Sequence, residues 1–194
     1  MINSDDQEYI HKVLSGDMNA FAVLVDRYKN MVFRLCLKMI NNREDAEELT
    51  QDSFIKVYRS LKQFKGESRF STWLYKIVYY TCLDRLKKLK RERQMVTINT
   101  FSVEQIAALQ TDFEQLEEKK RKELVQECLQ LLPEEDSFLL TLYYLEEQSV
   151  KEIAQIIGAT ESNIKVKLFR SRNKLTTLLQ AQTAIININH YATE

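Results

Sequence analysis

The sequence is poor in the two residues that most often build turns: three of its 194 residues are glycine and one is proline. Folds made of many short β-strands usually need more of both, because each tight connection between strands requires a turn. The chain is rich instead in leucine, lysine, glutamate, glutamine and arginine, which favour helices. We therefore predict an all-α protein, and its 44% of hydrophobic residues are enough to form compact cores.

Cysteine and histidine are also scarce, and their spacing excludes the common metal-binding patterns. Cys36, Cys82 and Cys128 are far apart and odd in number, and none belongs to a CxxC pair. Neither His11 nor His190 lies at ligand spacing from a cysteine or an acidic residue. We expect buried free thiols in a reducing compartment and no metal site.

Signatures of enzymes, secretion and membrane insertion are missing as well. The chain has no phosphate-binding loop, no dinucleotide fingerprint and no legible pairing of a nucleophile with a base. Its first residues, MINSDD, lack the basic and apolar regions of a signal peptide, and no stretch has the length of a membrane span. We expect a soluble, cytoplasmic protein that is not an enzyme and needs no cofactor.

Hydrophobic periodicity and capping residues divide the chain into two helical domains. Four helices are expected in the first domain, with interruptions at Gly16, Asn41–Asn42 and Gly66. Asp17 can cap the second of these helices and Asn42 the third. A stretch without strong helical periodicity follows, and then a second set of helices. We place the first domain at 1–93, a linker at 94–115, the second domain at 116–180 and a frayed tail at 181–194.

The clearest local signal is a pair of capped helices in the second domain. Ser149 and Glu152 fit a capping box at the start of a short helix, and Gly158 can end that helix. Thr160 can cap a second helix. The segment 149–175 is therefore typical of a helix-turn-helix.

The second helix of this pair has an apolar back and a basic front. Ile164, Leu168 and Leu175 are expected to face the core, whereas Lys165 and Phe169 share the opposite face. The basic residues of the helix are Lys165, Lys167, Arg170, Arg172 and Lys174, against the single acid Glu161. Such a helix suits the major groove of DNA, and the alternative is a basic helix that is merely solvated.

Residues 64–80 combine aromatic, basic and hydroxyl side chains. Because stacking contributes about 1–3 kcal/mol per base, such a surface can hold unstacked bases. The helix that follows ends in a basic cluster, which can neutralise phosphates: Arg85, Lys87, Lys88, Lys90, Arg91 and Arg93. The alternative is that Trp73 and Ile77 belong to the core, as we expect for Phe70 and Leu74, and that the cluster is a solvated helix end.

Acidic residues crowd the start of the third expected helix: Glu44, Asp45, Glu47, Glu48 and Asp52. The helix dipole favours acids at this end and supplies a purely structural explanation. Five acids are more than the dipole requires, and an exposed acidic ridge followed by Gln51, Lys56 and Arg59 is also typical of a docking face. Both interpretations stay open on these residues alone.

These three signals, in this order, resemble the extracytoplasmic-function (ECF) sigma factors of the sigma-70 family. Residues 45–64, DAEELTQDSFIKVYRSLKQF, resemble the family's polymerase-docking helix. Residues 70–77, FSTWLYKI, match the F-x-T-W-L-x-x-I signature of its promoter-melting segment. Leu132–Pro133, residues 152–154 (EIA) and residues 164–172 (IKVKLFRSR) resemble its C-terminal DNA reader.

The resemblance covers roughly residues 10–92 and 118–179. It implies a sigma factor that directs bacterial RNA polymerase to specific promoters and helps to melt them, without catalysis of its own. The first domain would be a four-helix, sigma-2-type domain that binds core polymerase and the minus-ten element. The second would be a sigma-4-type helix-turn-helix domain that binds the minus-thirty-five element. The implied partners are the RNA polymerase core and promoter DNA, and many relatives also bind an anti-sigma factor.

The resemblance assigns the site residues as follows. The residues implied to dock on polymerase are Asp45, Glu48, Gln51, Asp52 and Lys56. Those implied to bind the minus-ten element are Lys65, Gly66, Ser68, Arg69, Phe70, Ser71, Trp73, Lys76, Tyr80, Arg85 and Lys88. Those implied to bind the minus-thirty-five element are Thr160, Glu161, Ser162, Lys165, Val166, Phe169 and Arg170. Two residues depart from the family pattern, since Tyr80 stands where many members carry asparagine and Val166 replaces a frequent serine.

Two other functions compete with this one. A stand-alone helix-turn-helix regulator would bind duplex DNA without polymerase, but it leaves the 64–80 segment and the acidic ridge unexplained. A helical adaptor that binds no DNA would use its basic faces only as solvated surface. The two alternatives differ from a sigma factor in whether purified core polymerase initiates transcription in their presence.

Overall fold

The computed structural model describes residues 4–92 and 118–191, and every regular element in these two ranges is helical. The all-α prediction is confirmed. The linker expected at 94–115 lies outside the described residues. The helices of the first half are α1 (Ser4–Leu14), α2 (Met18–Ile40), α3 (Arg43–Ser60), the 3₁₀ turn η1 (Leu61–Gln63) and α4 (Phe70–Glu92). Those of the second half are α6 (Glu118–Leu131), α7 (Glu134–Tyr144), α8 (Val150–Ile157) and α9 (Glu161–Tyr191).

The helix boundaries follow the capping residues that the sequence predicts. The Asp17 carboxylate accepts a hydrogen bond from the backbone N–H of Asn19 at 2.9 Å and begins α2. The Asn42 side chain accepts from the backbone N–H of Asp45 at 3.0 Å and begins α3. Because these side chains satisfy N–H groups that have no partner within the helix, each cap fixes where its helix starts.

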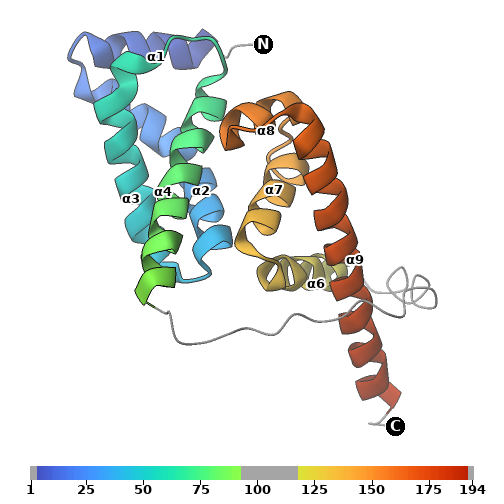
Figure 1. Ribbon diagram of the computed structural model, residues 1–194. Coiled ribbons are helices and arrows are strands. Elements are labelled where there is room, and N and C mark those ends of the chain that lie inside the picture. The colour runs from blue at the N-terminus through green and yellow to red at the C-terminus, as the bar shows by residue number, and fades with distance from the viewer. Residues whose placement is uncertain (1–3, 93–117, 192–194) are drawn as a thin grey trace.

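In the first half, α2, α3 and α4 lie side by side, and α1 crosses one end of them (Figure 1). Their shared core is apolar and fully buried, with Leu35 from α2, Val57 from α3 and Leu74 from α4 each 0% exposed. The aliphatic residue Ile10 anchors α1 on this bundle. The apolar positions recur at steps of three and four, so burial of one stripe per helix stabilises the bundle.

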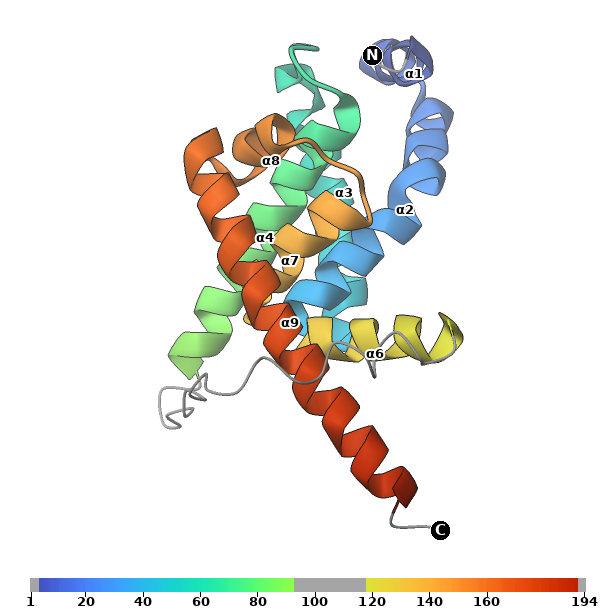
Figure 2. The same ribbon diagram turned by 90° about the vertical axis from the view of Figure 1, so that its right-hand side faces the viewer.

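In the second half, α7 and α8 pack against the long helix α9, and α6 crosses it (Figures 1 and 2). Pro133 precedes α7, as predicted, because proline cannot continue the preceding helix but fits the start of the next. The predicted capping box is present, with reciprocal bonds between Ser149 and Glu152. Gly158 ends α8 at a φ of +75°, which residues other than glycine rarely adopt.

The predicted frayed tail from residue 181 is wrong for most of its length. Helix α9 continues to Tyr191, eleven residues beyond the predicted domain boundary at 180. Thr183 is fully buried and Gln180 is 8% exposed, and α9 packs along α6. Tertiary packing therefore stabilises a segment whose own hydrophobic pattern is weak.

The two halves pack against each other. Helix α4 packs on α8, and α2 packs on α7 (Figures 1 and 2). The rings of Tyr79 in α4 and Phe138 in α7 stack with their centroids 5.0 Å apart. The buried side chains of both halves form one continuous hydrophobic cluster. Sequence periodicity predicts the core of each half but gives no indication of this contact.

All three cysteines are buried and free, as predicted. The thiol of Cys82 donates to the sulfur of Cys36 at 3.7 Å, which joins α4 to α2 inside the first core. Among the described helices, none combines the length and the hydropathy needed to cross a bilayer.

Candidate nucleic-acid interface

The front of the predicted recognition helix is exposed at the start of α9. Thr160 caps the helix, with its hydroxyl oxygen accepting from the backbone N–H of Asn163 at 3.2 Å. On the back, Ile164 is fully buried and Leu168 is 3% exposed, which fixes the rotation of the helix. The residues predicted to meet the minus-thirty-five element are all exposed: Thr160, Glu161, Ser162, Lys165, Val166, Phe169 and Arg170.

Two large apolar side chains stand out on this front. Phe169 is 62% exposed and Val166 is 47% exposed, while Lys165 and Arg170 flank them on the same surface. An exposed phenylalanine ring flanked by cations matches the contacts that a DNA groove offers. There, apolar side chains contact thymine methyl groups, and cations contact phosphates or guanine.

The other basic residues of α9 are used inside the protein. Lys167 lies 3.7 Å from a carboxylate oxygen of Glu135, and Lys174 lies 2.6 Å from one of Asp136. Both acids belong to the first turn of α7, where the helix dipole favours them. Fewer cations are therefore available on the front of α9 than the sequence predicts, because these two lysines hold α9 on α7.

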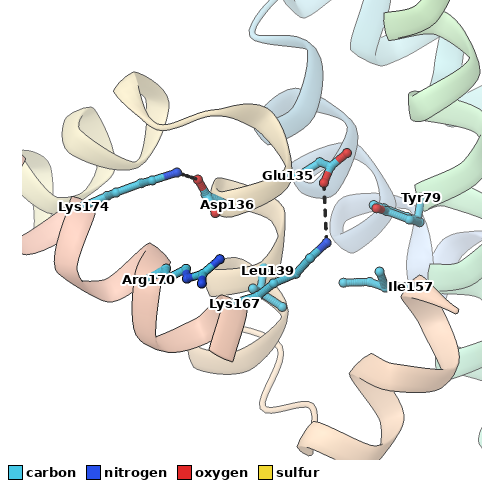
Figure 3. Close-up of a pocket in the computed structure, with 8 residues that line it drawn as sticks. All are labelled: Tyr79, Glu135, Asp136, Leu139, Ile157, Lys167, Arg170 and Lys174. Atoms are coloured by element: carbon cyan, nitrogen blue, oxygen red, sulfur yellow. Dashed lines mark hydrogen bonds and ion pairs between the residues drawn. The ribbon is translucent and has the colours of Figure 1, made fainter. Parts of the chain in front are cut away.

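A cavity of about 180 Å³ lies beside these ion pairs (Figure 3). Figure 3 shows the Lys167 and Lys174 side chains reaching toward Glu135 and Asp136, with Arg170 between them. Tyr79 of α4 lines the same cavity, so it lies at the junction of the two halves. Arg172, on another side of α9, lies over the rings of Tyr143 and Tyr144 at 5.4 and 5.5 Å.

The segment predicted to read the minus-ten element is built on an aromatic cluster at the start of α4. The rings of Phe64 and Phe70 lie 5.7 Å apart, and those of Phe64 and Trp73 lie 5.3 Å apart. Phe70 is 2% exposed, whereas Trp73 is only partly buried. Phe70 therefore supports the loop before α4 from beneath, and Trp73 keeps one part of its ring accessible.

The remaining predicted minus-ten residues surround this cluster and continue along α4. Five of them are exposed: Lys65, Arg69, Lys76, Tyr80 and Lys88. Four are partly buried: Gly66, Ser68, Ser71 and Arg85. Gly66 has a φ of +73°, so the turn of the loop needs glycine at that position.

Arg85 differs from the other basic residues of its cluster because it joins α4 to α3. Its guanidinium bonds the Asp45 carboxylate and lies 3.7 Å from Glu48. Lys87, Lys88 and Arg91 are exposed and can meet phosphates. Within the basic cluster, Arg85 therefore positions the two helices, and its neighbours carry the accessible charge.

The predicted docking ridge lies along α3. Glu48, Gln51, Asp52 and Lys56 are exposed, and Asp45 is partly buried by its pairing with Arg85. The Lys56 ammonium donates to the Thr81 hydroxyl at 3.1 Å, which ties the ridge to α4. Two members of the ridge, Asp45 and Lys56, are thus tied to α4.

Sequence reasoning missed one residue of this ridge, Ile55. It is 47% exposed and lies three and four positions after Asp52 and Gln51, so it shares their face. The signal was in the spacing, because the buried positions Phe54 and Val57 leave Ile55 out of phase with the core. An exposed apolar side chain on this face could contribute to a protein interface, whose buried centre is enriched in apolar residues.

Two predicted minus-ten residues also contact the second half. Arg69 lies 3.1 Å from a carboxylate oxygen of Glu152, and the Tyr80 hydroxyl donates to the Ile157 carbonyl at 3.2 Å. Burial favours the neutral form of Glu152, but hydrogen bonds from Ser149 and the charge of Arg69 outweigh it and lower the pKa of this carboxyl. Burial raises the pKa of Tyr79, beside this contact, to about 12.

In residues 4–92 and 118–191, histidine, cysteine, aspartate and glutamate nowhere gather in a group of three or more that could bind a metal ion. The arrangement instead offers exposed cations next to accessible aromatic and apolar side chains. Such a surface can bind nucleic acid through phosphates, base edges and stacking.

Comparison with known proteins gives the same two units. The chain matches the family models described as Sigma-70 region 2, over residues 24–92, and Sigma-70, region 4, over residues 122–175. It is 31% identical over 181 residues to the ECF RNA polymerase sigma-E factor of Haemophilus influenzae, covering 90% of this chain and 95% of the relative. It is 29% identical over 177 residues to the ECF RNA polymerase sigma factor SigW of Bacillus subtilis, covering 88% and 95%.

Two solved structures share the fold. One is the sigma factor RpoE in complex with the anti-sigma factor NepR from Bartonella quintana, with a TM-score of 0.62, 22% identity, and coverage of 82% of this chain and 96% of that one. The other is CnrH in complex with the cytosolic domain of CnrY, with a TM-score of 0.60, 20% identity, and coverage of 92% and 99%. The matched regions include the recognition helix front and the α3 ridge, and they leave α1 and the end of α9 outside.

Proposed function

Since this chain belongs to the ECF sigma factors of the sigma-70 family, we propose that it binds core RNA polymerase, directs it to specific promoters and stabilises the melted DNA. The observation that carries the proposal is the front of α9. There Phe169 and Lys165 are exposed, while Ile164 and Leu168 on the back are buried. A helix held in this way presents one face to a major groove.

The C-terminal half binds the minus-thirty-five element. Thr160, Glu161 and Ser162 at the start of α9 approach base edges or phosphates, because the first turn of a recognition helix lies deepest in the groove. Lys165 and Arg170 bind phosphate or guanine, while Val166 and Phe169 contact apolar base edges. Phosphate contacts supply most of the affinity, and the few base contacts supply the specificity.

The N-terminal half captures bases of the minus-ten element after they leave the stack. Trp73 and Tyr80 offer aromatic surface, and the loop residues Lys65, Gly66, Ser68, Arg69 and Ser71 surround it. Lys76 and Lys88 line the path of the strand, Arg85 holds α4 on α3 beside it, and Phe70 packs beneath. Stacking on aromatic rings supports this role, because it compensates for the lost base stacking.

The α3 ridge docks on core polymerase. Asp45, Glu48, Gln51, Asp52 and Lys56 form its polar part, and Ile55 adds an apolar contact at its centre. Protein interfaces combine an apolar centre with a polar rim, and Ile55 with its polar neighbours on α3 fits that arrangement. The chain forms and breaks no covalent bond itself, and the polymerase supplies the chemistry.

We further propose that the chain acts in the cytoplasm, where polymerase and promoters are found, and without a cofactor. The proposed domains are 1–93 and a second domain that begins at 116 and includes α9 to Tyr191, joined by the linker 94–115. An anti-sigma factor is a further proposed partner. A solved structure of the same fold supports it, because the sigma factor in that structure is bound to the anti-sigma factor NepR.

Transcription by purified core polymerase tests the proposal, on matched templates with a duplex and a pre-melted minus-ten element. The expected result is initiation from both templates only when the chain is present. A stand-alone regulator would bind the duplex template yet give no initiation, and a helical adaptor would give neither. Either of these outcomes would refute the sigma-factor assignment.

Reversal of one charge on the α3 ridge tests the docking assignment. We expect Asp52→Arg to weaken binding to core polymerase by about tenfold or more, because the side chain is exposed and the new charge opposes the original one. The control is Asp26→Arg, an equal charge change on the exposed face of α2. Normal core binding by Asp52→Arg, with an unchanged circular dichroism spectrum, would contradict the assignment.

A further inference from the structure

Helix α1 borders the loop 65–69, which is proposed to hold an unstacked base of the minus-ten element. The helix lies outside the matched Sigma-70 region 2, which begins at residue 24. Figures 1 and 2 show α1 at the end of the bundle where the chain passes from η1 into α4, and α1 packs on η1. The loop therefore has a neighbour that the matched region does not include.

Gln7 is the residue of α1 that approaches the loop most clearly. A Cβ atom at Gly66 would lie 3.4 Å from the side-chain nitrogen of Gln7, Nε2. Gly66 has a φ of +73°, and the amide of Gln7 lies next to the place where a side chain at this position would stand. Gln7 is only partly buried, so its amide stays accessible beside the loop.

A buried carboxylate next to Gln7 fixes the rotation of α1. Asp6 is 3% exposed, and it accepts hydrogen bonds from the Arg27 guanidinium at 2.5 Å and from the Tyr28 hydroxyl at 2.6 Å, both on α2. Ile10, one turn further along α1, is buried as well. Because successive residues of a helix are about 100° apart, this anchor also sets the direction of Gln7.

The anchor of α1 is tied to the aromatic cluster that supports the loop. The ring of Tyr28 meets the ring of Phe70 edge-on, with their centroids 5.5 Å apart. Phe70 in turn contacts Phe64 and Trp73. Gln7 and the partly accessible ring of Trp73 are therefore held by one connected set of contacts.

The charges near the loop favour different parts of a DNA strand. Lys62 and Lys65, on η1 and the loop, are exposed and attract phosphates. Helix α1 instead exposes Asp5 and Glu8, which repel phosphates. We therefore expect the sugar–phosphate backbone to follow the lysines, which leaves the neutral amide of Gln7 to meet a base.

A carboxamide can distinguish bases where most groups around the loop cannot. Aromatic rings stack on every base, and lysines contact every phosphate. A glutamine side chain has one acceptor oxygen and two N–H donors, so it can form two hydrogen bonds with one base edge.

We propose that Gln7 is a specificity-determining residue of the minus-ten site, and that its carboxamide hydrogen-bonds the edge of the unstacked base at the loop 65–69. This inference rests on the proposed function, since it adds a residue to the same DNA-binding surface. Its consequence is that the choice of base at one promoter position depends on a helix outside the matched Sigma-70 region 2.

Promoter binding by the holoenzyme, made from core polymerase and the full chain, tests the proposal. The templates are pre-melted, and each minus-ten position of the non-template strand carries each of the four bases in turn. Wild type is expected to prefer one base at the position that the loop holds. Gln7→Ala should reduce that preference about tenfold and leave the preferences at the other positions unchanged.

A second variant, Gln7→Glu, should change which base is preferred at this position, because a carboxylate accepts hydrogen bonds but donates none. Both substitutions keep a good helix former at a partly exposed position, so the fold is expected to stay intact. The matched control is Gln63→Ala, which removes the same carboxamide from an exposed position of η1. It should leave every base preference unchanged.

Equal losses on all templates with Gln7→Ala would show that α1 only supports the loop, and would overturn the proposal. An unchanged profile with both Gln7 variants, or a wild type indifferent to the base at every position, would overturn it too. Absence of initiation by the wild-type holoenzyme from every template would instead overturn the proposed function.

Discussion

At the scale of single residues, the cations of α9 divide into two groups. Lys165 is exposed on the front of the helix, beside the exposed ring of Phe169. Lys167 and Lys174 instead pair with Glu135 and Asp136 of α7. The front cation is therefore accessible to DNA, whereas the two paired lysines stabilise the packing of α9 on α7.

Removing the exposed cation of the recognition front is expected to weaken promoter use through the upstream element. For Lys165→Ala we expect a loss of about 1–3 kcal/mol if the ammonium meets a base, or a salt-dependence slope lower by about one if it meets a phosphate. Binding to promoter duplexes, with and without the minus-thirty-five element, measures both. Lys167→Ala is the control, since its ammonium already pairs with Glu135. Equal losses on both duplexes would count against the assignment.

The three thiols are expected to be unreactive in the native protein. All are buried, and burial raises the pKa of Cys128 to about 11. Only about one Cys128 thiol in a thousand is then ionised at pH 8, and the thiolate is the reactive form. A chromogenic disulfide reagent should titrate none of the thiols quickly in native protein and all three after denaturation. Rapid reaction of the native protein would show that these cores open readily.

At the scale of elements, caps and hydrophobic stripes predict where most helices begin and end. Asp17, Asn42, Ser149 and Thr160 all cap the helices they were expected to cap. The end of α9 was not predictable in this way, because its stability comes from Thr183 and Gln180 packed in the second half. A local pattern cannot reveal a helix that is stabilised mainly by its neighbours.

The capping box of α8 gives a stability prediction for the helix-turn-helix. Ser149→Ala removes the side chain that accepts from the Glu152 N–H, so the free energy of unfolding should fall by about 1 kcal/mol. Urea unfolding followed by circular dichroism measures the change. Lys151→Ala, in the same helix at an exposed position, should shift stability much less. Equal effects of the two substitutions would mean that the cap does not stabilise α8 measurably.

At the scale of the whole molecule, the fold class and the two units follow from the sequence, but their packing does not. Tyr75, Tyr79 and Phe138 fit the apolar pattern of their own helices, so nothing local marks them as contacts between halves. The contact also includes Glu146, an acid that follows α7 and accepts from Arg34 of α2. The whole molecule is therefore two helical halves joined by one continuous hydrophobic cluster, which the pattern of neither half predicts.

The central claim is that this chain gives core polymerase its choice of start sites. Mapping RNA 5′ ends made by purified core polymerase on genomic DNA, with and without the chain, measures that choice directly. A sigma factor should produce new, discrete 5′ ends that appear only with the chain and share two upstream sequence elements at constant spacing. An identical set of 5′ ends in both reactions would contradict the claim.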